Sequence, residues 1–143
     1  MSEQENIKVA HTFFDAWNAG DLSKAYPYEA DDIRVEAPGT AGPMTKEQSQ
    51  MYNQGFLDAF PGSRFEVIRT IAQGDYVVTQ WKASGTHTGP LRTPSGGTIA
   101  PTAKMATLSG STVSEIKNGK IARSWNYWDM AGLLIQLGLM PAM

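Results

Sequence analysis

The stretch that decides the fold is Asn118-Gly-Lys-Ile-Ala-Arg-Ser-Trp-Asn-Tyr-Trp-Asp129, which runs directly into Met130-Ala-Gly-Leu-Leu-Ile-Gln-Leu-Gly-Leu139. Asn118 and Gly119 both tolerate positive φ, so this pair predicts a tight turn between two strands. The residues after the turn predict a strand whose side chains alternate between two faces. One face is expected to carry Ile121, Trp125, Tyr127 and Asp129, and the other Ala122, Ser124, Asn126 and Trp128.

Asp129 ends the aromatic face of this strand, and two interpretations of it are open. A carboxylate in apolar surroundings costs several kcal/mol, so burial would raise its pKa toward the range that suits a general acid. Alternatively, Asp129 caps the helix that begins at Met130. The two interpretations are compatible at the mouth of a cavity.

Composition sets the class of protein. The chain has 143 residues, of which 41% are hydrophobic, and this length and composition predict one domain over residues 1–143 with a substantial core. Its net charge is −2. No basic block indicates nucleic acid or an anionic membrane as a partner. With no cysteine, a disulfide framework and thiolate chemistry are excluded. The polar first residues and the lack of a long apolar run predict a cytoplasmic protein.

Helices come first in the chain and strands later. Apolar periodicity predicts a helix over 3–18, a short one from Leu22, and a third from a capping box at Thr45 to Phe60. Strands are expected over 33–37, 64–72, 76–87, 104–116 and 120–129, with a Gly- and Pro-rich loop over 89–101. This order predicts an α+β fold with a mostly antiparallel sheet.

A curved sheet with helices on one face can enclose a cone-shaped pocket. We expect a cavity between the first helix, the third helix and the strand face that bears aromatic side chains. Six large aromatics are candidate lining residues, although the same residues could form a plain core: Trp17, Tyr52, Phe56, Trp81, Trp125 and Tyr127. Aromatic walls would suit a planar, apolar small molecule.

The chain resembles the SnoaL-like polyketide cyclase (ester cyclase) family of the nuclear transport factor 2-like superfamily. The stretches that carry the resemblance follow the family's order over nearly the whole chain: Phe13-Phe-Asp-Ala-Trp-Asn-Ala-Gly-Asp21, Ala59-Phe-Pro-Gly62, Gly74-Asp-Tyr-Val-Val-Thr-Gln-Trp81, Gly85-Thr-His-Thr-Gly89, Pro101-Thr-Ala-Lys104, Gly119-Lys-Ile121 through Trp125 to Asp129, and Gln136-Leu-Gly138. The resemblance implies three N-terminal helices on a curved sheet of the cystatin-like α+β barrel type, a deep apolar pocket and a homodimer.

The resemblance also implies a chemistry. An Asp at the position of Asp129 is the general acid/base of an intramolecular aldol ring closure that needs no cofactor. Other members are epoxide hydrolases, isomerases or dehydratases, or have no known activity. Isomerisation therefore stays open beside cyclisation, and the alternatives are epoxide opening and ligand binding without catalysis. This chain departs from the family at Arg123-Ser124, where Glu and a polar residue are common, and at Ala103, where the family has Gly.

His87 and Glu115 are the candidate partners of Asp129. His87 shares a strand face with Trp81, and imidazole is the side chain best suited to proton transfer near neutral pH. The strand face on which Glu115 lies depends on the turn. A two-residue turn at Asn118-Gly119 places Glu115 opposite Ala122 and away from Asp129. A three-residue turn with a bulge at Gly119 places Glu115 opposite Ile121 and on the same face as Asp129.

Other expectations concern metals and assembly. The two histidines are far apart and no acidic loop pattern is present, so no metal site is predicted. We expect a homodimer through the outer face of the sheet, which the alternation assigns to Ala122, Ser124, Asn126 and Trp128.

Overall fold

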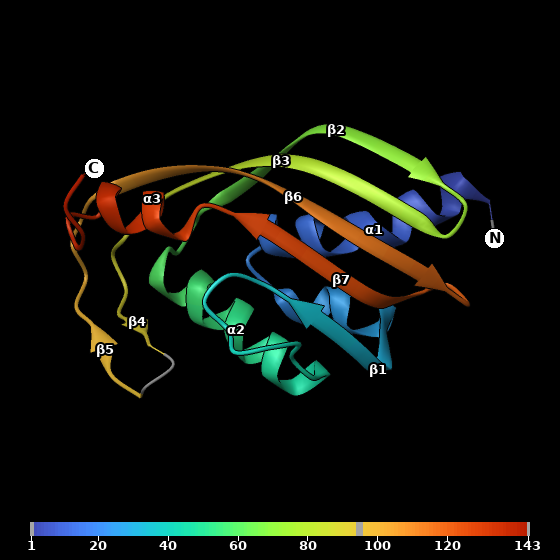
Figure 1. Cartoon of the computed structure of the whole chain (residues 1–143), viewed down its shortest axis with the longest axis horizontal. Helices are drawn as coiled ribbons and strands as arrows, with labels where there is room; N and C mark the ends of the chain where they lie inside the picture. Colours follow the sequence, from blue (N-terminus) through green and yellow to red (C-terminus); the bar gives the residue numbers. More distant parts are fainter. Residues whose placement is uncertain (1, 94–95, 143) are drawn as a thin grey trace.

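The computed structural model describes residues 2–93 and 96–142. Figure 1 shows helices packed against one side of a long, twisted sheet. The helices are α1 (Glu3–Asn18), the 3₁₀ helix η1 (Leu22–Tyr28), α2 (Lys46–Ala59) and α3 (Met130–Gln136). The strands are β1 (Glu29–Glu36), β2 (Arg64–Gln73), β3 (Tyr76–Thr86), β4 (Leu91–Arg92), β5 (Thr98–Ile99), β6 (Met105–Lys117) and β7 (Lys120–Trp128).

The helices begin where the sequence predicts. Ser2 caps α1, and its hydroxyl accepts a hydrogen bond from the Glu5 N–H at 3.1 Å. At α2, Thr45 and Gln48 form the predicted capping box, in which each side chain accepts from the other residue's backbone N–H. These contacts satisfy N–H groups that have no partner within the first turn. The helix expected from Leu22 is present as the 3₁₀ turn η1.

The sheet has the strand order β1-β7-β6-β3-β2. All neighbouring strands are antiparallel except β1 and β7, which run parallel, so the predicted α+β fold with a mostly antiparallel sheet is confirmed. β1 and β2 form the two edges, and the sheet therefore stays open instead of closing into a barrel. The loop expected over 89–101 contains the β4–β5 hairpin, while residues 94–95 lie outside the described part.

The alternation predicted for the last strand is interrupted by a bulge. Lys117 pairs with Lys120 across the predicted two-residue turn, in which Asn118 and Gly119 have φ of 53° and 74°. Ile116 then pairs with Ile121, but Glu115 pairs with Arg123, so Ala122 is an extra residue. Beyond Ala122 the two faces are exchanged relative to the prediction.

The buried core lies between the helices and the inner face of the sheet. It forms three clusters: Val9, Ala10, Ile33, Val35, Met44, Val77, Ile116 and Ile121; Ala59, Phe60, Leu91, Ala106, Leu133 and Leu137; and Trp17, Leu22 and Leu57. Asn18 fixes the end of α1 to the edge strand β2, because its side chain donates to the Phe65 carbonyl at 2.9 Å and accepts from the Phe65 N–H at 2.8 Å. In the part of the chain that the structure describes, no helix is long and apolar enough to cross a membrane.

Candidate functional site

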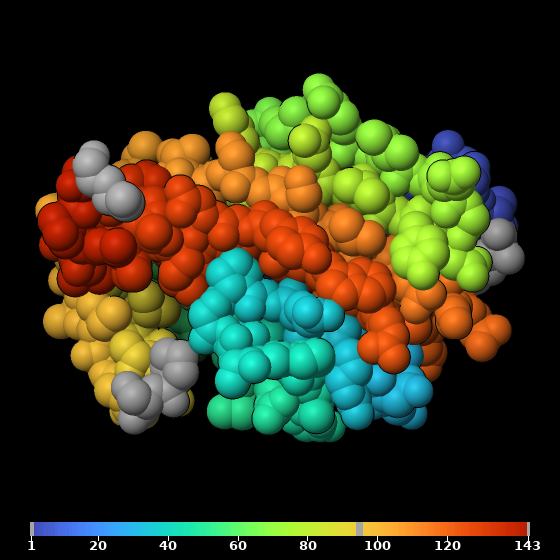
Figure 2. Space-filling model, viewed as in Figure 1, coloured from blue at the N-terminus to red at the C-terminus, as the bar shows by residue number. Residues whose placement is uncertain are grey.

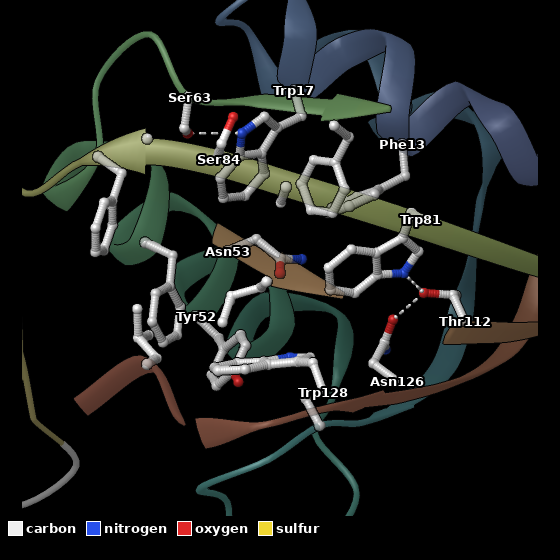
Figure 3. Close-up of a pocket in the computed structure, with 18 of the residues that line it drawn as sticks. Phe13, Trp17, Tyr52, Asn53, Ser63, Trp81, Ser84, Thr112, Asn126 and Trp128 are labelled. Atoms are coloured by element: carbon white, nitrogen blue, oxygen red, sulfur yellow. Dashed lines mark hydrogen bonds between the residues drawn. The ribbon is translucent and has the colours of Figure 1, made fainter. Parts of the chain in front are cut away.

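A cavity lies between α1, α2 and the inner face of the sheet (Figure 3). The space open to the centres of water molecules is about 110 Å³. Its walls are Phe13, Trp17, Val35, Ala37, Tyr52, Asn53, Phe56, Phe60, Ser63, Phe65, Trp81, Ala83, Ser84, Gly85, Ala106, Leu108, Thr112, Asn126, Trp128 and Leu133. The expected cavity between the first helix, the third helix and the sheet is therefore present, and most of its wall is apolar.

Aromatic rings in edge-to-face contact form one side of this cavity. Phe65 lies at the centre of the group, with its ring centroid 5.1 Å from that of Trp17 and 4.8 Å from that of Trp81. The Trp17 indole is held in place because its Nε1 donates to Ser63 Oγ at 3.0 Å. On the opposite side, Phe56 packs edge-on against Trp128 at 5.5 Å. These contacts fix the rings as a preformed wall.

Four of the six candidate lining residues are in this wall, namely Trp17, Tyr52, Phe56 and Trp81. Trp125 and Tyr127 are not, and their expected placement is wrong. The bulge at Ala122 turns both side chains to the outer face, where Tyr127 is 62% exposed. Figure 2 shows the atoms of β7, in orange-red, reaching the surface between β1 and β6.

The same bulge turns three residues inward that the alternation had assigned to the outside, namely Ser124, Asn126 and Trp128. Asn126 and Trp128 line the cavity, and neither was a candidate site residue. The signal that could have found them is weak, since the extra residue is an alanine and nothing in its sequence context marks a bulge.

A chain of hydrogen bonds forms the polar end of the cavity. Trp81 Nε1 donates to Thr112 Oγ1 at 3.0 Å, and Thr112 Oγ1 donates to Asn126 Oδ1 at 2.8 Å (Figure 3). Asn126 Nδ2 donates to the Glu36 carbonyl and to Ser124 Oγ, both at 3.1 Å. The bond to a backbone carbonyl fixes the orientation of the Asn126 amide, because a carbonyl can only accept.

Asn53 is a polar side chain of the cavity that has no hydrogen-bond partner among the described residues. It lies on α2 between Tyr52 and Gln54, and Figure 3 shows its amide directed into the cavity beside Trp81. An amide offers two N–H donors and one carbonyl acceptor. Asn53 can therefore hydrogen-bond to a polar group of a bound molecule without losing a bond within the protein.

Tyr52 is the one titratable residue among the described residues that line this cavity. Its hydroxyl donates to the Pro38 carbonyl at 2.8 Å, and burial raises the pKa of the phenol well above its ordinary value. The hydroxyl is therefore a neutral, occupied donor at physiological pH.

Asp129 lies at the surface and caps α3. Its Oδ1 accepts a hydrogen bond from the Gly132 N–H at 2.8 Å, and the residue is exposed. Of the two interpretations of Asp129, the structure bears out the helix cap. The expectation that Asp129 is buried at the mouth of the cavity is wrong, because the bulge at Ala122 turns this strand face outward.

His87 is fully buried, but it lies behind the cavity wall instead of in it. Its ring stacks on Phe60 at 5.2 Å, and Nδ1 accepts from the Thr102 N–H at 3.2 Å, which leaves the proton on Nε2. Within the described residues, Nε2 has no hydrogen-bond partner that meets the usual geometry. Burial lowers the pKa of His87, and an interaction with the Gly89 backbone opposes this only in part. The imidazole is thus neutral and separated from the cavity by Phe60.

Glu115 lies on the outer face of the sheet. It accepts a hydrogen bond from the Tyr76 hydroxyl at 3.0 Å and pairs across the strands with Arg123. The two-residue turn predicted at Asn118-Gly119 is present, but neither expected pairing of Glu115 is, because the bulge lies at Ala122. Glu115 shares a strand face with Trp125 and Tyr127, outside the cavity.

Metal binding finds no support in the described ranges, 2–93 and 96–142, where no three His, Cys, Asp or Glu side chains form a group that could hold an ion. The cavity wall is built from neutral side chains. It can stack on a planar molecule and offer hydrogen bonds at one end.

Comparison with known proteins agrees with this architecture. Residues 7–137 match the family model of the SnoaL-like polyketide cyclases. No curated protein matches the chain.

Solved structures also resemble the chain. AclR from Streptomyces galilaeus is 24% identical, with a TM-score of 0.85 over 99% of this chain and 90% of that one. IdmH from Streptomyces antibioticus is 26% identical, with a TM-score of 0.77 over 93% and 98% of the two chains. A SnoaL-like protein from Jannaschia sp. CCS1 is 18% identical, with a TM-score of 0.84 over 97% and 95%. The match over residues 7–137 establishes that the chain belongs to the SnoaL-like polyketide cyclase family.

Proposed function

We propose that this protein is a cofactor-independent cyclase or isomerase for an apolar, polycyclic small molecule that carries a carbonyl group. The observation that supports this is the cavity itself, which has aromatic walls and one polar end. Aromatic walls favour planar conjugated rings, and a few placed polar groups fix a ligand's orientation. Membership of the SnoaL-like polyketide cyclase family supports a small molecule as the ligand.

In this proposal the polar end binds the carbonyl oxygen. The amide of Asn53 donates to that oxygen, and it donates more strongly when the oxygen gains negative charge as the neighbouring carbon loses a proton. The aromatic walls hold the enolate carbon and the second carbonyl of the ligand within reach of each other, so that intramolecular attack closes the new ring. Positioning of this kind can contribute about 7–11 kcal/mol to lowering a barrier.

The proposal does not use Asp129, His87 or Glu115 as the acid/base. Asp129 caps a helix, His87 is shielded by Phe60, and Glu115 faces outward. In this proposal these three residues contribute to the stability of the fold, and the groups that line the cavity bind and orient the ligand.

Binding of two matched probes tests this proposal. 2-Tetralone and naphthalene have similar bicyclic shapes, but only the ketone can accept from Asn53; both can be followed by quenching of the fluorescence of Trp17 and Trp81. We expect Asn53→Leu to weaken 2-tetralone binding about fivefold, which corresponds to one hydrogen bond of ~1 kcal/mol. Naphthalene binding should stay unchanged.

The control is Gln54→Leu, on the exposed side of the same helix, where Gln54 bonds only to Asp58. It should change neither affinity. If Asn53→Leu weakened the binding of 2-tetralone and of naphthalene equally, the effect would be one of packing and would contradict recognition of the carbonyl group by Asn53.

A second function, ligand binding without catalysis, is favoured by one observation. Among the described residues that line the aromatic cavity there is no Asp, Glu, His, Lys or Arg. Acceleration of deuterium exchange at the carbon next to the ketone of 2-tetralone in D₂O would distinguish an enzyme from a binding protein, because a protein that only binds leaves the exchange rate unchanged.

We also propose a homodimer through the outer face of the sheet, with other residues than the alternation predicted. The register places Ile71, Val78, Val113 and Trp125 in one apolar row across four strands. Ile71 is 59% exposed, so this row would gain from being covered by a second copy. Light scattering at micromolar concentration should give twice the mass of 15.6 kDa, and a monomer mass would refute the dimer.

A further inference from the structure

A second, smaller cavity lies behind the polar end of the aromatic one. The two cavities share five wall residues: Phe13, Val35, Asn53, Thr112 and Asn126. The second cavity differs in chemistry, because half of its wall is polar: Glu29, Ser49, Asn53, Thr112, Ser114, Ser124 and Asn126. Glu29 is the one carboxylate that lines either cavity within the described residues.

The volume and the polar groups of this cavity suit water. The space open to water centres is about 50 Å³, and a water needs about 10–15 Å³ of such space, so about four would fit. Ser114 is only 3% exposed, and its hydroxyl has no hydrogen-bond partner among the described residues. Buried hydroxyl groups of this kind are normally paired with protein or with ordered water.

The hydrogen bonds at the polar end point toward this cavity. Donors run from Trp81 to Thr112, from Thr112 to Asn126, and from Asn126 to Ser124. Because Ser124 Oγ accepts from Asn126, its own hydrogen is free to donate into the second cavity. A chain of donors in this direction favours a negative charge at its far end.

Glu29 lies at that far end, at the start of β1. Its Oε1 accepts from Gln50 Nε2 at 2.9 Å, which leaves its second oxygen for another partner. The charged or titratable groups nearest to it are Lys46, whose Nζ lies 3.4 Å from the Glu29 carbonyl oxygen, and Tyr26 on η1. The wall residues from α1 are apolar, and those from β6 and β7 are neutral.

We propose that the second cavity holds a short chain of water molecules, through which Glu29 exchanges a proton with the molecule bound in the aromatic cavity. This inference rests on the proposed function and supplies the acid/base that the aromatic cavity lacks. Burial raises the pKa of Glu29 above its ordinary value, with the Gln50 bond and Lys46 opposing in part. A raised pKa makes the carboxylate a stronger base.

The proton transfer balances without another reactant. The C–H bond next to the ligand's carbonyl breaks, its electron pair stays on the ligand as an enolate, and the proton passes to the nearest water. Each water passes one proton on, and the last protonates the free oxygen of Glu29. After the enolate carbon forms its new bond, the resulting alkoxide takes the proton back along the same path.

Deuterium exchange of 2-tetralone in D₂O tests this path, since exchange needs only the first step and its reversal. We expect the folded wild-type protein to accelerate exchange, and Glu29→Gln to lower the rate about 100-fold, within the range of general acid/base catalysis. The control is Asp32→Asn, which removes an exposed carboxylate from the same strand at a residue that lines neither cavity. It should exchange like wild type.

The pH profile separates proton transfer from a structural role. Only the ionised Glu29 accepts a proton, so the wild-type rate should fall as the pH drops through a midpoint above the ordinary 4.5, and Glu29→Gln should lack this fall. Ser114→Val is a second variant, which fills the water path and leaves Glu29 in place. It should lower exchange as well, with 2-tetralone binding unchanged.

The outcomes are distinguishable. Equal acceleration by wild type and Glu29→Gln would overturn the role of Glu29 and leave the proposed function standing. Acceleration that Ser114→Val leaves unchanged would overturn the water path. Binding of 2-tetralone with no acceleration by the wild-type protein would overturn both the inference and the catalytic function.

Discussion

Gly110 on β6 gives a sharp test of how the aromatic wall is built. It pairs with Trp81 on one side and Trp128 on the other, and the Trp81 indole lies over it. A Cβ at this position would meet Trp81 Cζ2, and would lie 2.6 Å from Trp81 Cη2 and 2.8 Å from the Tyr127 carbonyl oxygen. Contacts below 3.0 Å force something to shift, and the backbone of β7 cannot shift easily.

The expected cost of Gly110→Ala follows from these contacts. Overpacking typically costs about 1–3 kcal/mol. Displacing Trp81 also breaks its bond to Thr112, worth ~1 kcal/mol, while alanine recovers about 0.5 kcal/mol of backbone entropy. We expect the free energy of unfolding to fall by about 2–3 kcal/mol, which lowers Tm by roughly 6–9 °C for a chain of this size.

The control is the same substitution at Gly55, within α2. A Cβ there has no heavy atom within 4 Å, so Gly55→Ala should raise the free energy of unfolding by about 0.5–1 kcal/mol. Urea denaturation followed by tryptophan fluorescence measures both variants. A Gly110→Ala variant as stable as wild type would refute the close packing of Trp81 against β6.

Three further predictions concern single side chains. Asn18→Ala removes both hydrogen bonds to the Phe65 backbone and should lower the free energy of unfolding by about 1–3 kcal/mol in urea denaturation. An unchanged denaturation midpoint would show that these two bonds do not stabilise the contact between α1 and β2. Burial raises the pKa of Tyr52, so the folded state favours the neutral phenol and the free energy of unfolding should fall as the pH rises above 10. In the same assay, Tyr52→Phe should lose less of its free energy of unfolding between about pH 10 and 11.5. Asp129→Ala should cost ~1 kcal/mol by removing the α3 cap while 2-tetralone exchange stays at the wild-type rate; a loss of exchange would restore Asp129 as the acid/base.

Local features of the fold could be predicted because they depend on neighbouring residues. The capping box of Thr45 and Gln48 and the turn at Asn118-Gly119 are encoded within four residues, and both are present. The helix-then-strand order predicted the fold class and the cavity between helices and sheet. Trp17 and Trp81 could be placed in its wall because they lie on regular elements with an uninterrupted period.

The chemistry of the site was harder to predict, because it depends on one irregular residue and on strand pairing. Strand side chains alternate with a period of two, so the single extra residue Ala122 exchanges every position after it. This moved Trp125, Tyr127 and Asp129 outward and brought Asn126 into the cavity. Glu29 could not be found either, because its position beside the second cavity results from the parallel pairing of β1 with β7, which no local pattern encodes.

The pairing of β1 with β7 also limits how the chain can fold. Asn126 on β7 donates to Glu36 on β1, and the two residues are 90 positions apart. Closing a flexible loop of that length costs about 4 kcal/mol of chain entropy before its contacts form. Contacts so distant in sequence are associated with slow folding. During synthesis, β1 therefore leaves the ribosome long before β7 exists, and one edge of the sheet, together with the polar end of the cavity, can be completed only after β7 has emerged as well.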